Sequence, residues 1–290
     1  MFDAIIIGKG PAGISASLYT VRAGLKTLVI GVNGSNLKKA EKVENYFGFS
    51  DVIRGEDLLR EGEKQALRLG VEIVEEEVLS LNKPDLFEVS TSTGKYQAKA
   101  VILATGQPQK KLDIVNLAKF EGIGVSYCTT CDGFFFKNKK VGILGFKDYA
   151  IHEAIEMQVF TKDITIFTDG NELDLTAAFL QQAMKFKIDK RPIARLGGDE
   201  SLKTVHFRDE TLEVIEGMFV AYDTAASVDF AKKMGVFTEN NAILVDKNQQ
   251  TNIIGLFAAG DCTGGFKQIA TAVGQGALAG RRVIEYVRNL

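Results

Sequence analysis

Short apolar runs alternate with glycine-bearing polar runs over the first 30 residues. The β-branched run Ala4–Ile7 predicts a buried strand, and it ends in the sequence GKGPAG at 8–13. The Ala- and Ser-rich stretch Ile14–Ala23 predicts a helix, and Thr27–Ile30 predicts a second strand. Strand, helix and strand in this order form one βαβ unit.

The same alternation returns further along the chain. A second βαβ unit begins near residue 139, with a strand at Lys140–Leu144, a helix at Tyr149–Phe160 and a strand at Ile164–Phe167. Other strands are predicted at Val71–Leu81, Leu86–Thr91, Val101–Ala104 and Leu256–Ala259, and a closing helix at Ile269–Leu290. Two separate βαβ units indicate two nucleotide-type domains.

Composition and charge narrow the class of protein. The chain has 290 residues, 46% hydrophobic and 25% charged, which is typical of a globular protein with about two domains. Its 35 basic and 37 acidic residues give a formal net charge of −2, which favours neither nucleic-acid nor membrane binding. Three cysteines do not form a disulfide scaffold and fit a reducing compartment. With no apolar run of about 18 residues and no signal peptide, we expect a cytoplasmic protein.

The GKGPAG sequence fits the dinucleotide-binding fingerprint. Gly8 allows the tight turn, Gly10 lets backbone approach a pyrophosphate, and Gly13 lets the helix pack on the strand. Glycine turns also occur without ligands, but this one follows a strand and opens a helix. The acidic residue expected about 20 residues on is absent from Ile30–Asn33, so Asn33 is a candidate ribose partner.

The CTTC sequence, Cys128 to Cys131, has three interpretations. A zinc site needs about four ligands, and the chain offers no second pair, so we expect no metal. Two inert buried thiols are the second interpretation. A redox dithiol is favoured because Asp132 follows at once, and a carboxylate can carry the proton that thiol–disulfide exchange requires. We expect Cys262 to be a small packed side chain, and the isolated histidines to be structural.

Several motifs together resemble the low-molecular-weight thioredoxin reductases over essentially the whole chain. They are GKGPAG, KVENYFGF (42–49), ILATG (102–106), CTTCDGFFF (128–136), MFVA (218–221), LFAAGDC (256–262) and KQIATAVGQG (267–276). The resemblance implies two Rossmann-like domains of the flavin disulfide reductase type, each with three layers and a mostly parallel sheet. It implies an FAD-binding domain at 1–113 and 223–290, and an inserted dithiol domain at 114–222 that rotates on hinges near Leu112–Val115 and Ala221–Thr224. It also implies a homodimer.

The resemblance further implies bound FAD. Its contacts would be Gly8, Gly10, Pro11, Ala12, Gly13, Asn33, Asn36, Leu37, Asn45, Val78, Ala104, Thr105, Gly106, Gly260, Asp261, Lys267, Gln268 and Ile269. Val78 would contact the adenine, Asn45 the isoalloxazine region, and Asp261 the ribityl chain or phosphate. Gln268 and Ile269 would cover the flavin ring. Ser35-Asn36 replace the family's Gly-Gln, and Lys267 replaces an arginine, which keeps the charge but loses the planar fork.

The second βαβ unit departs from the family at its nicotinamide motifs. In GFKDYA (145–150), Phe146 and Lys147 replace two glycines where backbone must approach a pyrophosphate. In FTDGNELD (167–174), acidic residues replace the family's His-Arg-Arg and would repel a 2′-phosphate. Asp169 would suit an unphosphorylated ribose, as in NADH. With both motifs lost, we expect no NADPH.

This pattern is similar to the ferredoxin-dependent flavin thioredoxin reductases. The resemblance implies that reduced ferredoxin supplies the electrons, that Cys131 faces the flavin, that Cys128 attacks the thioredoxin disulfide, and that Asp132 moves the proton. Two alternatives remain open: an NAD(P)H-dependent reductase with an altered site, and a flavin redox sensor without turnover. The cluster Lys137, Lys139 and Lys140 is either a solvated loop or a docking patch for an acidic partner.

Overall fold

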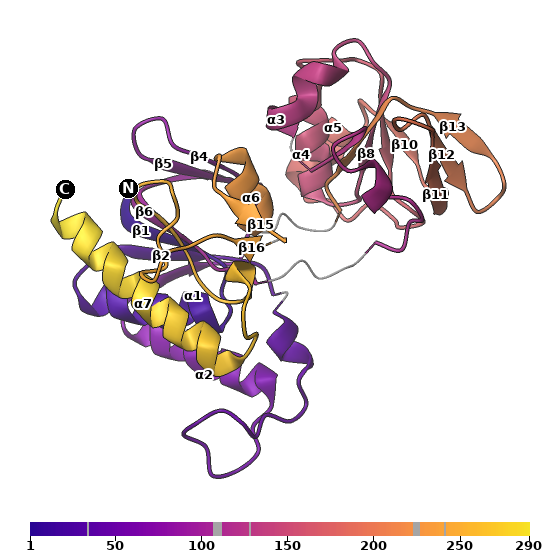
Figure 1. The fold of residues 1–290 in the computed structure, drawn as a ribbon. Helices are drawn as coiled ribbons and strands as arrows, with labels where there is room; N and C mark the ends of the chain where they lie inside the picture. The colour runs from indigo at the N-terminus through magenta and orange to yellow at the C-terminus, as the bar shows by residue number, and fades with distance from the viewer. Residues whose placement is uncertain (34, 107–111, 128, 223–226, 241) are drawn as a thin grey trace. The chain divides into compact units, whose positions relative to one another are not determined.

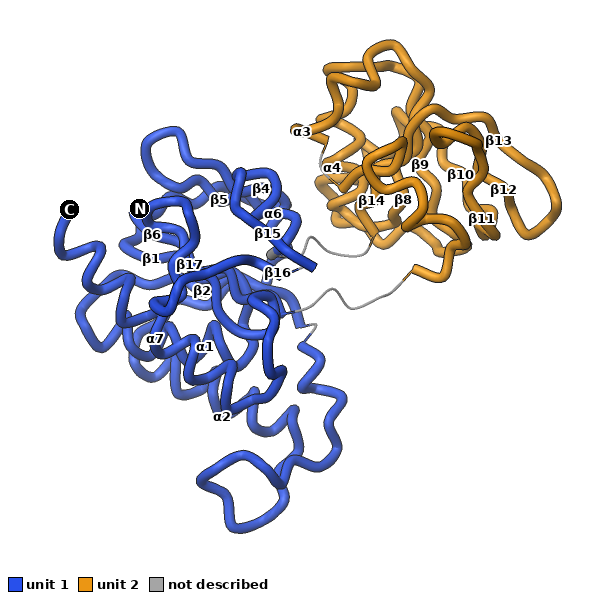
Figure 2. Tube along the Cα trace, in the orientation of Figure 1, with its two compact units in different colours: residues 1–108, 226–290 blue, residues 109–225 orange. Residues whose placement is uncertain are grey.

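The chain divides into two compact units. The computed structural model describes residues 1–33, 35–106, 112–127, 129–222, 227–240 and 242–290. Unit 1 comprises residues 1–108 and 226–290, and unit 2 comprises residues 109–225, so that unit 2 is inserted into unit 1 (Figure 2). The predicted hinge Ala221–Thr224 lies partly outside the described residues.

Unit 1 is built on a sheet whose parallel part has the order β3-β2-β1-β6-β17. These strands are β1 (Phe2–Ile7), β2 (Thr27–Ile30), β3 (Glu72–Val74), β6 (Lys95–Leu103) and β17 (Leu256–Ala258). The first residues of β6 pair antiparallel with β5 (Phe87–Thr91), which pairs with β4 (Val78–Asn82). β1, β2, β5 and β17 confirm predicted strands, because short apolar runs of this kind are buried in the sheet.

The prediction of one strand over Val71–Leu81 is wrong, because the chain changes partners within this stretch. β3 pairs parallel with β2 as far as Val74, and β4 pairs antiparallel with β5 from Val78 onward. The three residues between them are all glutamates, a residue type that is depleted in strands. β6 also begins earlier than the predicted strand at Val101–Ala104, because its first residues are held by β5.

Three helices of unit 1 lie together along one side of this sheet (Figure 1). They are α1 (Pro11–Arg22), α2 (Gly55–Arg68) and α7 (Ile269–Arg288). α1 and α7 confirm predicted helices, and they approach closely: a Cβ on Gly276 would lie 2.1 Å from the carbonyl oxygen of Ala12. α2 was not predicted, because its charge-rich sequence offers few apolar positions. The smaller elements of unit 1 are η1 (Asn36–Lys39), α6 (Ser227–Lys233), β15 (Thr238–Glu239), β16 (Ala242–Ile243) and η4 (Asp261–Thr263).

Unit 2 has its own parallel sheet, in the order β10-β9-β8-β14-β7. Its strands are β7 (Val125–Ser126), β8 (Val141–Leu144), β9 (Ile164–Phe167), β10 (Lys187–Asp189) and β14 (Gly217–Val220). An antiparallel sheet of β11 (Ile193–Gly197), β12 (Thr204–Phe207) and β13 (Leu212–Val214) shares its core. The helical elements of unit 2 are η2 (Ala118–Phe120), α3 (Thr129–Asp132), η3 (Gly133–Phe136), α4 (Asp148–Met157) and α5 (Ala177–Ala183).

β8, α4 and β9 confirm the predicted second βαβ unit, although α4 ends before the predicted Phe160. Parallel sheets with helices in both units confirm the predicted α/β class with Rossmann-like units. Within the described ranges, no helix has both the length and the apolar character needed to cross a membrane.

Candidate active site

Predicted FAD residues of unit 1 gather at one edge of its parallel sheet. The register pairs Ile7 with both Ile30 and Leu103, and Leu103 with Ala258. The four strands therefore end in one row, and the residues that follow them line the same edge. These residues are Gly8, Gly31, Ala104 and Ala259. Ligands of open α/β sheets bind at this carboxyl edge.

Gly8 and Gly13 are required by close packing at this edge. Gly8 has a φ of +114°, and a Cβ there would lie 2.3 Å from the carbonyl oxygen of Ala104. A Cβ on Gly13 would lie 1.9 Å from the carbonyl oxygen of Gly8. These two glycines bring the start of α1 directly against the ends of β1 and β6.

Gly10 differs from these two glycines because its surroundings are open. Among the described residues, the nearest atom to a Cβ on Gly10 would be Ser35 Oγ, at 3.8 Å. Gly10 is the N-cap of α1, and Pro11 follows as the first helical residue. The amides of a helix's first turn have no acceptor within the helix, so they are available to an anion. An open cap at a helix N-terminus suits a pyrophosphate.

The strand end after β17 completes this cradle. Gly260 has a φ of +85°, and a Cβ there would lie 2.9 Å from Ala12 Cβ in the first turn of α1. Its amide donates to Gln275 Oε1 of α7 at 2.8 Å, and Asp261 begins η4 directly afterwards. On the other side, Thr105 and Gly106 follow Ala104. The structure thus brings together cofactor residues predicted from three distant parts of the sequence.

Asn33 lies beside an acidic residue that the sequence reasoning missed. Asn33 Nδ2 donates to Glu75 Oε1, and Glu75 follows directly after β3. Lys9, whose side chain is 7% exposed, places its ammonium 3.2 Å from Glu75 and 3.4 Å from Glu63. The sequence pattern predicts an acidic residue after β2. The parallel register of β2 with β3 brings the acid from the neighbouring strand instead.

Two predicted flavin contacts meet although 223 positions separate them in sequence. Asn45 Nδ2 donates to Gln268 Oε1 at 3.0 Å, which joins the loop after η1 to the start of α7. Asn36 and Leu37 belong to η1, and Ile269 is the first residue of α7, while Lys267 is exposed. Val78 is buried at the start of β4, in the antiparallel part of the sheet.

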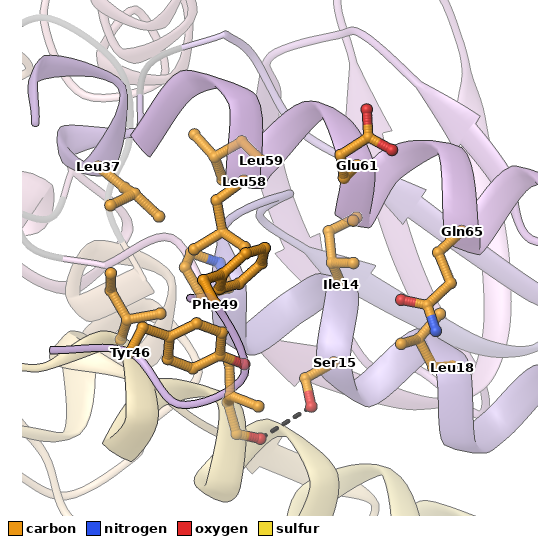
Figure 3. Close-up of a pocket in the computed structure, with 14 residues that line it drawn as sticks. Ile14, Ser15, Leu18, Leu37, Tyr46, Phe49, Leu58, Leu59, Glu61 and Gln65 are labelled. Atoms are coloured by element: carbon orange, nitrogen blue, oxygen red, sulfur yellow. Dashed lines mark hydrogen bonds between the residues drawn. The ribbon is translucent and has the colours of Figure 1, made fainter. Parts of the chain in front are cut away.

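A largely apolar cavity of about 290 Å³ lies between α1, α2, α7 and the loop that carries Asn45 (Figure 3). Figure 3 shows Leu58 and Leu59 of α2 above Phe49 and Tyr46, with Ile14 of α1 to the right of them. The predicted residues Pro11, Leu37 and Ile269 also line it. Its volume is at the lower end of the range for ligand pockets, about 300–1,000 Å³.

These features fit FAD. An open helix N-terminus is present for a pyrophosphate, and a carboxylate with a side-chain amide is present for a ribose. An amide pair from Asn45 and Gln268 is present for the polar edge of a ring system.

Cys131 of the predicted dithiol lies in unit 2, shortly after β7, an edge strand of its parallel sheet. Cys131 belongs to α3, is exposed and is disulfide-bonded, whereas Cys128 lies outside the described residues. Asp132 accepts a hydrogen bond from Ser126 Oγ, at 2.6 Å from its Oδ2. Ser126 is 6% exposed, so it fixes the carboxylate directly beside Cys131. Cys262 of unit 1 is a buried thiol whose Sγ donates to the carbonyl oxygen of Ala259 at 3.3 Å.

The degenerate glycine motif of unit 2 carries bulky side chains that pack on their neighbours. A Cβ on Gly145 would lie 2.2 Å from the carbonyl oxygen of Ala221. The Phe146 ring packs edge-on against Tyr222, with ring centroids 5.2 Å apart, and the Lys147 ammonium lies 5.7 Å from the Phe146 centroid. Phe146 thus occupies the place of the fingerprint's second glycine.

The loop after β9, residues 168–174, has no basic side chain at the position where a 2′-phosphate would need one. Asp169 Oδ1 accepts the amide of Ile193 at 2.7 Å, and Asn171 Nδ2 donates to the Tyr222 hydroxyl at 2.8 Å. Glu172 pairs with Lys190. Asp169, which the sequence suggested for a ribose, is thus already engaged with the backbone of β11.

Fold and site together define the class of protein. Residues 2–276 match the family model described as pyridine nucleotide-disulphide oxidoreductase, and the chain belongs to this family.

Its relatives are thioredoxin reductases. The thioredoxin reductase of Listeria innocua is 34% identical over 304 aligned positions, which cover 100% of this chain and 95% of the relative. The crystal structure of the atypical thioredoxin reductase TRi from Desulfovibrio vulgaris Hildenborough is 40% identical, with a TM-score of 0.96, covering 100% of this chain and 99% of the other. A ferredoxin-flavin thioredoxin reductase from Clostridium acetobutylicum is 29% identical, with a TM-score of 0.74, covering 100% and 99%.

Proposed function

We propose that the protein is an FAD-dependent disulfide reductase that reduces thioredoxin through the Cys128–Cys131 dithiol, with electrons from reduced ferredoxin. The observation that carries the reductase activity is an exposed, disulfide-bonded Cys131 followed directly by the anchored carboxylate of Asp132. The relatives named thioredoxin reductase supply the partner. Full retention of the CTTCDG sequence favours turnover over a sensor.

Unit 1 holds the cofactor in this proposal. Gly10 and the first turn of α1 bind the pyrophosphate, Glu75 and Asn33 the ribose, and Asn45 with Gln268 the flavin. FAD, when bound, supplies a carrier that takes single electrons and passes on a pair. The largely apolar cavity beside α1 adjoins this part of the site, because Pro11, Leu37 and Ile269 line it.

Unit 2 performs the thiol chemistry. Reduction of one disulfide to two thiols takes two electrons and two protons, and Asp132 exchanges a proton at the Cys131 sulfur. Ser126 orients that carboxylate by donating to its Oδ2. The Cys128 thiolate then attacks the thioredoxin disulfide, forms a mixed disulfide and releases one thioredoxin thiol, and Cys131 resolves it as the second thiol leaves.

Ferredoxin is the proposed electron donor because bulky and acidic side chains replace the nicotinamide-binding motifs of unit 2. Phe146 with Tyr222 stands where a pyrophosphate needs bare backbone, and Asp169 and Glu172 stand where a 2′-phosphate needs cations. The ferredoxin-flavin reductase among the structural relatives supports this donor. The reduction potentials agree with this donor. Low-potential ferredoxins lie at about −400 mV and thioredoxin at about −270 mV. The difference of about 130 mV favours electron transfer to thioredoxin by about 6 kcal/mol for two electrons.

An NAD(P)H-dependent reductase is the second candidate. It is favoured by the match to the pyridine nucleotide-disulphide oxidoreductase family, which extends through Gly145 and the start of α4. Relatives named simply thioredoxin reductase also favour it. Using it would require Phe146 to leave its contact with Tyr222.

The partners need surfaces, and two are proposed. Lys137 and Lys139 are exposed near the dithiol and would face an acidic ferredoxin, whereas Lys140 is already paired with Glu213 at 2.8 Å.

A homodimer is proposed through the loop after η1, where Phe47 is 98% exposed and Val52 51% exposed. Gel filtration of a Phe47→Ser variant tests the dimer.

Anaerobic flavin bleaching tests the donor. Reduced ferredoxin should bleach the bound flavin, and added salt should slow it, since charge pairing at exposed surfaces is screened over about 8–10 Å at physiological ionic strength. NADPH and NADH at about millimolar levels, the upper range of ordinary KM values, should not bleach it at a useful rate. Rapid bleaching by NADPH, with saturable binding in calorimetry, would restore the second candidate.

A further inference from the structure

A buried carboxylate lies directly behind the dithiol turn, and the proposed reaction leaves it unused. Glu153, on α4, is 2% exposed. Its Oε2 accepts a hydrogen bond from Thr129 Oγ1 at 2.8 Å, and its Oε1 lies 3.3 Å from His152 Nδ1. Thr129 is itself 1% exposed and is the first of the two threonines between Cys128 and Cys131.

Burying a carboxylate costs free energy, so the contact between Glu153 and Thr129 needs a structural explanation. The reason lies in α3, which has only four residues. A helix of this length is not stable by itself, because each first turn fixes several dihedral angles for one hydrogen bond. Contacts with neighbouring elements must therefore hold the turn that carries Cys131.

Two side-chain hydrogen bonds do this, one at each end of α3. Thr129, its first residue, is bound to Glu153 of α4, and Asp132, its last residue, is bound to Ser126 of β7. Cys131 lies between the two anchors and is exposed. The Asp132 contact places a group beside the sulfur, whereas the Glu153 contact acts only through Thr129.

We propose that Glu153 is a positioning residue for the dithiol. Through Thr129 it fixes the α3 turn, and a negative charge behind that turn opposes formation of a thiolate there, so that at a pH where the dithiol ionises, about 8.5 and above for an ordinary thiol, it stabilises the disulfide relative to the dithiol. His152, whose side chain is 21% exposed, contacts the second oxygen of Glu153 and reaches solvent. The inference rests on the proposed function only in taking the CTTC pair as a dithiol that cycles.

The test is the disulfide–dithiol equilibrium of the FAD-loaded enzyme in dithiothreitol redox buffers, read by alkylation and mass spectrometry. Glu153→Gln removes the charge and keeps the size. Thr129→Val removes the hydroxyl that donates to Glu153, so that the carboxylate no longer holds the α3 turn. Each variant should shift the equilibrium about tenfold toward the dithiol, which is about 30 mV for this two-electron couple. The double variant should shift it no further, because both changes remove one contact.

Two controls separate this role from packing. Thr129→Ser keeps the hydroxyl and should stay within about twofold of the parent. Thr161→Val removes another buried threonine hydroxyl of unit 2, bound to the carbonyl oxygen of Lys139 at 2.6 Å, and should also leave the equilibrium unchanged. Melting temperatures verify folding, and where Thr129→Val does not fold, Glu153→Gln with Thr129→Ser carries the measurement.

An equilibrium unchanged in Glu153→Gln overturns the inference, and so does a Thr129→Ser variant that shifts as far as Thr129→Val. Thioredoxin reduction is measured separately on the same variants. If the equilibrium shifts as stated while the parent enzyme does not reduce thioredoxin, the proposed function fails and the positioning role stands. If the parent reduces thioredoxin and the equilibrium does not respond, the positioning role fails alone.

Discussion

Replacing Asp132 by asparagine removes the proton-exchanging group beside Cys131 with little change in shape. Asparagine keeps the size of aspartate and still accepts the hydrogen bond from Ser126 Oγ, which spans 2.6 Å. The variant should therefore fold and bind FAD. A positioned acid or base is typically worth about 10²–10⁴-fold, so electron transfer between flavin and dithiol should slow by that factor.

Ser126→Ala gives a graded second measurement. Losing a hydrogen bond to a charged group costs about 1.5–3 kcal/mol, so an Asp132 carboxylate without its anchor should slow the same step by up to about 10–150-fold. Stopped-flow flavin absorbance follows the step, with Asp163→Asn as the control because Asp163 is an exposed carboxylate of unit 2. The reasoning is refuted if Asp132→Asn traces overlay those of the parent, or if Ser126→Ala is the slower variant.

Three further changes test the cradle, the third cysteine and the core of unit 2. Gly13→Ala should cost roughly 1–3 kcal/mol of stability and lower the flavin bound per chain, because its Cβ would lie 1.9 Å from the carbonyl oxygen of Gly8; full flavin content would contradict this. Cys262→Ala should leave thioredoxin reduction within about tenfold of the parent, since the thiol is buried packing; a larger loss with FAD retained would make it a catalytic thiol. Burial raises the pKa of Asp189, but hydrogen bonds from Arg191 outweigh this and hold it below its usual value. Asp189→Asn should therefore lower the melting temperature at neutral pH. Thermal scans should show the gap beginning to close as pH falls below about 4, the ordinary pKa that the carboxyl has in the unfolded chain, and closing fully only below the lower pKa of the folded parent.

The sequence predicted secondary structure best where burial of apolar side chains alone determines the element. β2 and β9 have the predicted bounds because each is a short β-branched run buried on both faces. α2 was missed although its few apolar residues recur with a helical period, because charged residues dominate its 14 positions and packing against α1 and η1 stabilises it. The break in Val71–Leu81 was missed because a change of pairing partner leaves no mark beyond three glutamates.

The site shows the same division. The glycine turn and the CTTC sequence are local, so their residue types predict their chemistry. Glu75 enters through the register of a neighbouring strand, and Glu153 enters through the packing of α4 behind α3. Neither is adjacent in sequence to the motif that it serves, so sequence spacing alone has no signal for them. The two anchors of α3 likewise depend on tertiary contacts.

Electron flow from ferredoxin to thioredoxin through the dithiol is the central claim. Its most direct test mixes catalytic enzyme with reduced ferredoxin and oxidised thioredoxin under anaerobic conditions, and counts thioredoxin thiols against ferredoxin oxidised. Low-potential ferredoxins of this kind transfer single electrons, so we expect about two of them to be consumed per thioredoxin disulfide, and no thiols with Cys131→Ser. Thioredoxin reduced equally well by Cys131→Ser, or reduced with NADPH in place of ferredoxin at the same rate, would contradict the account.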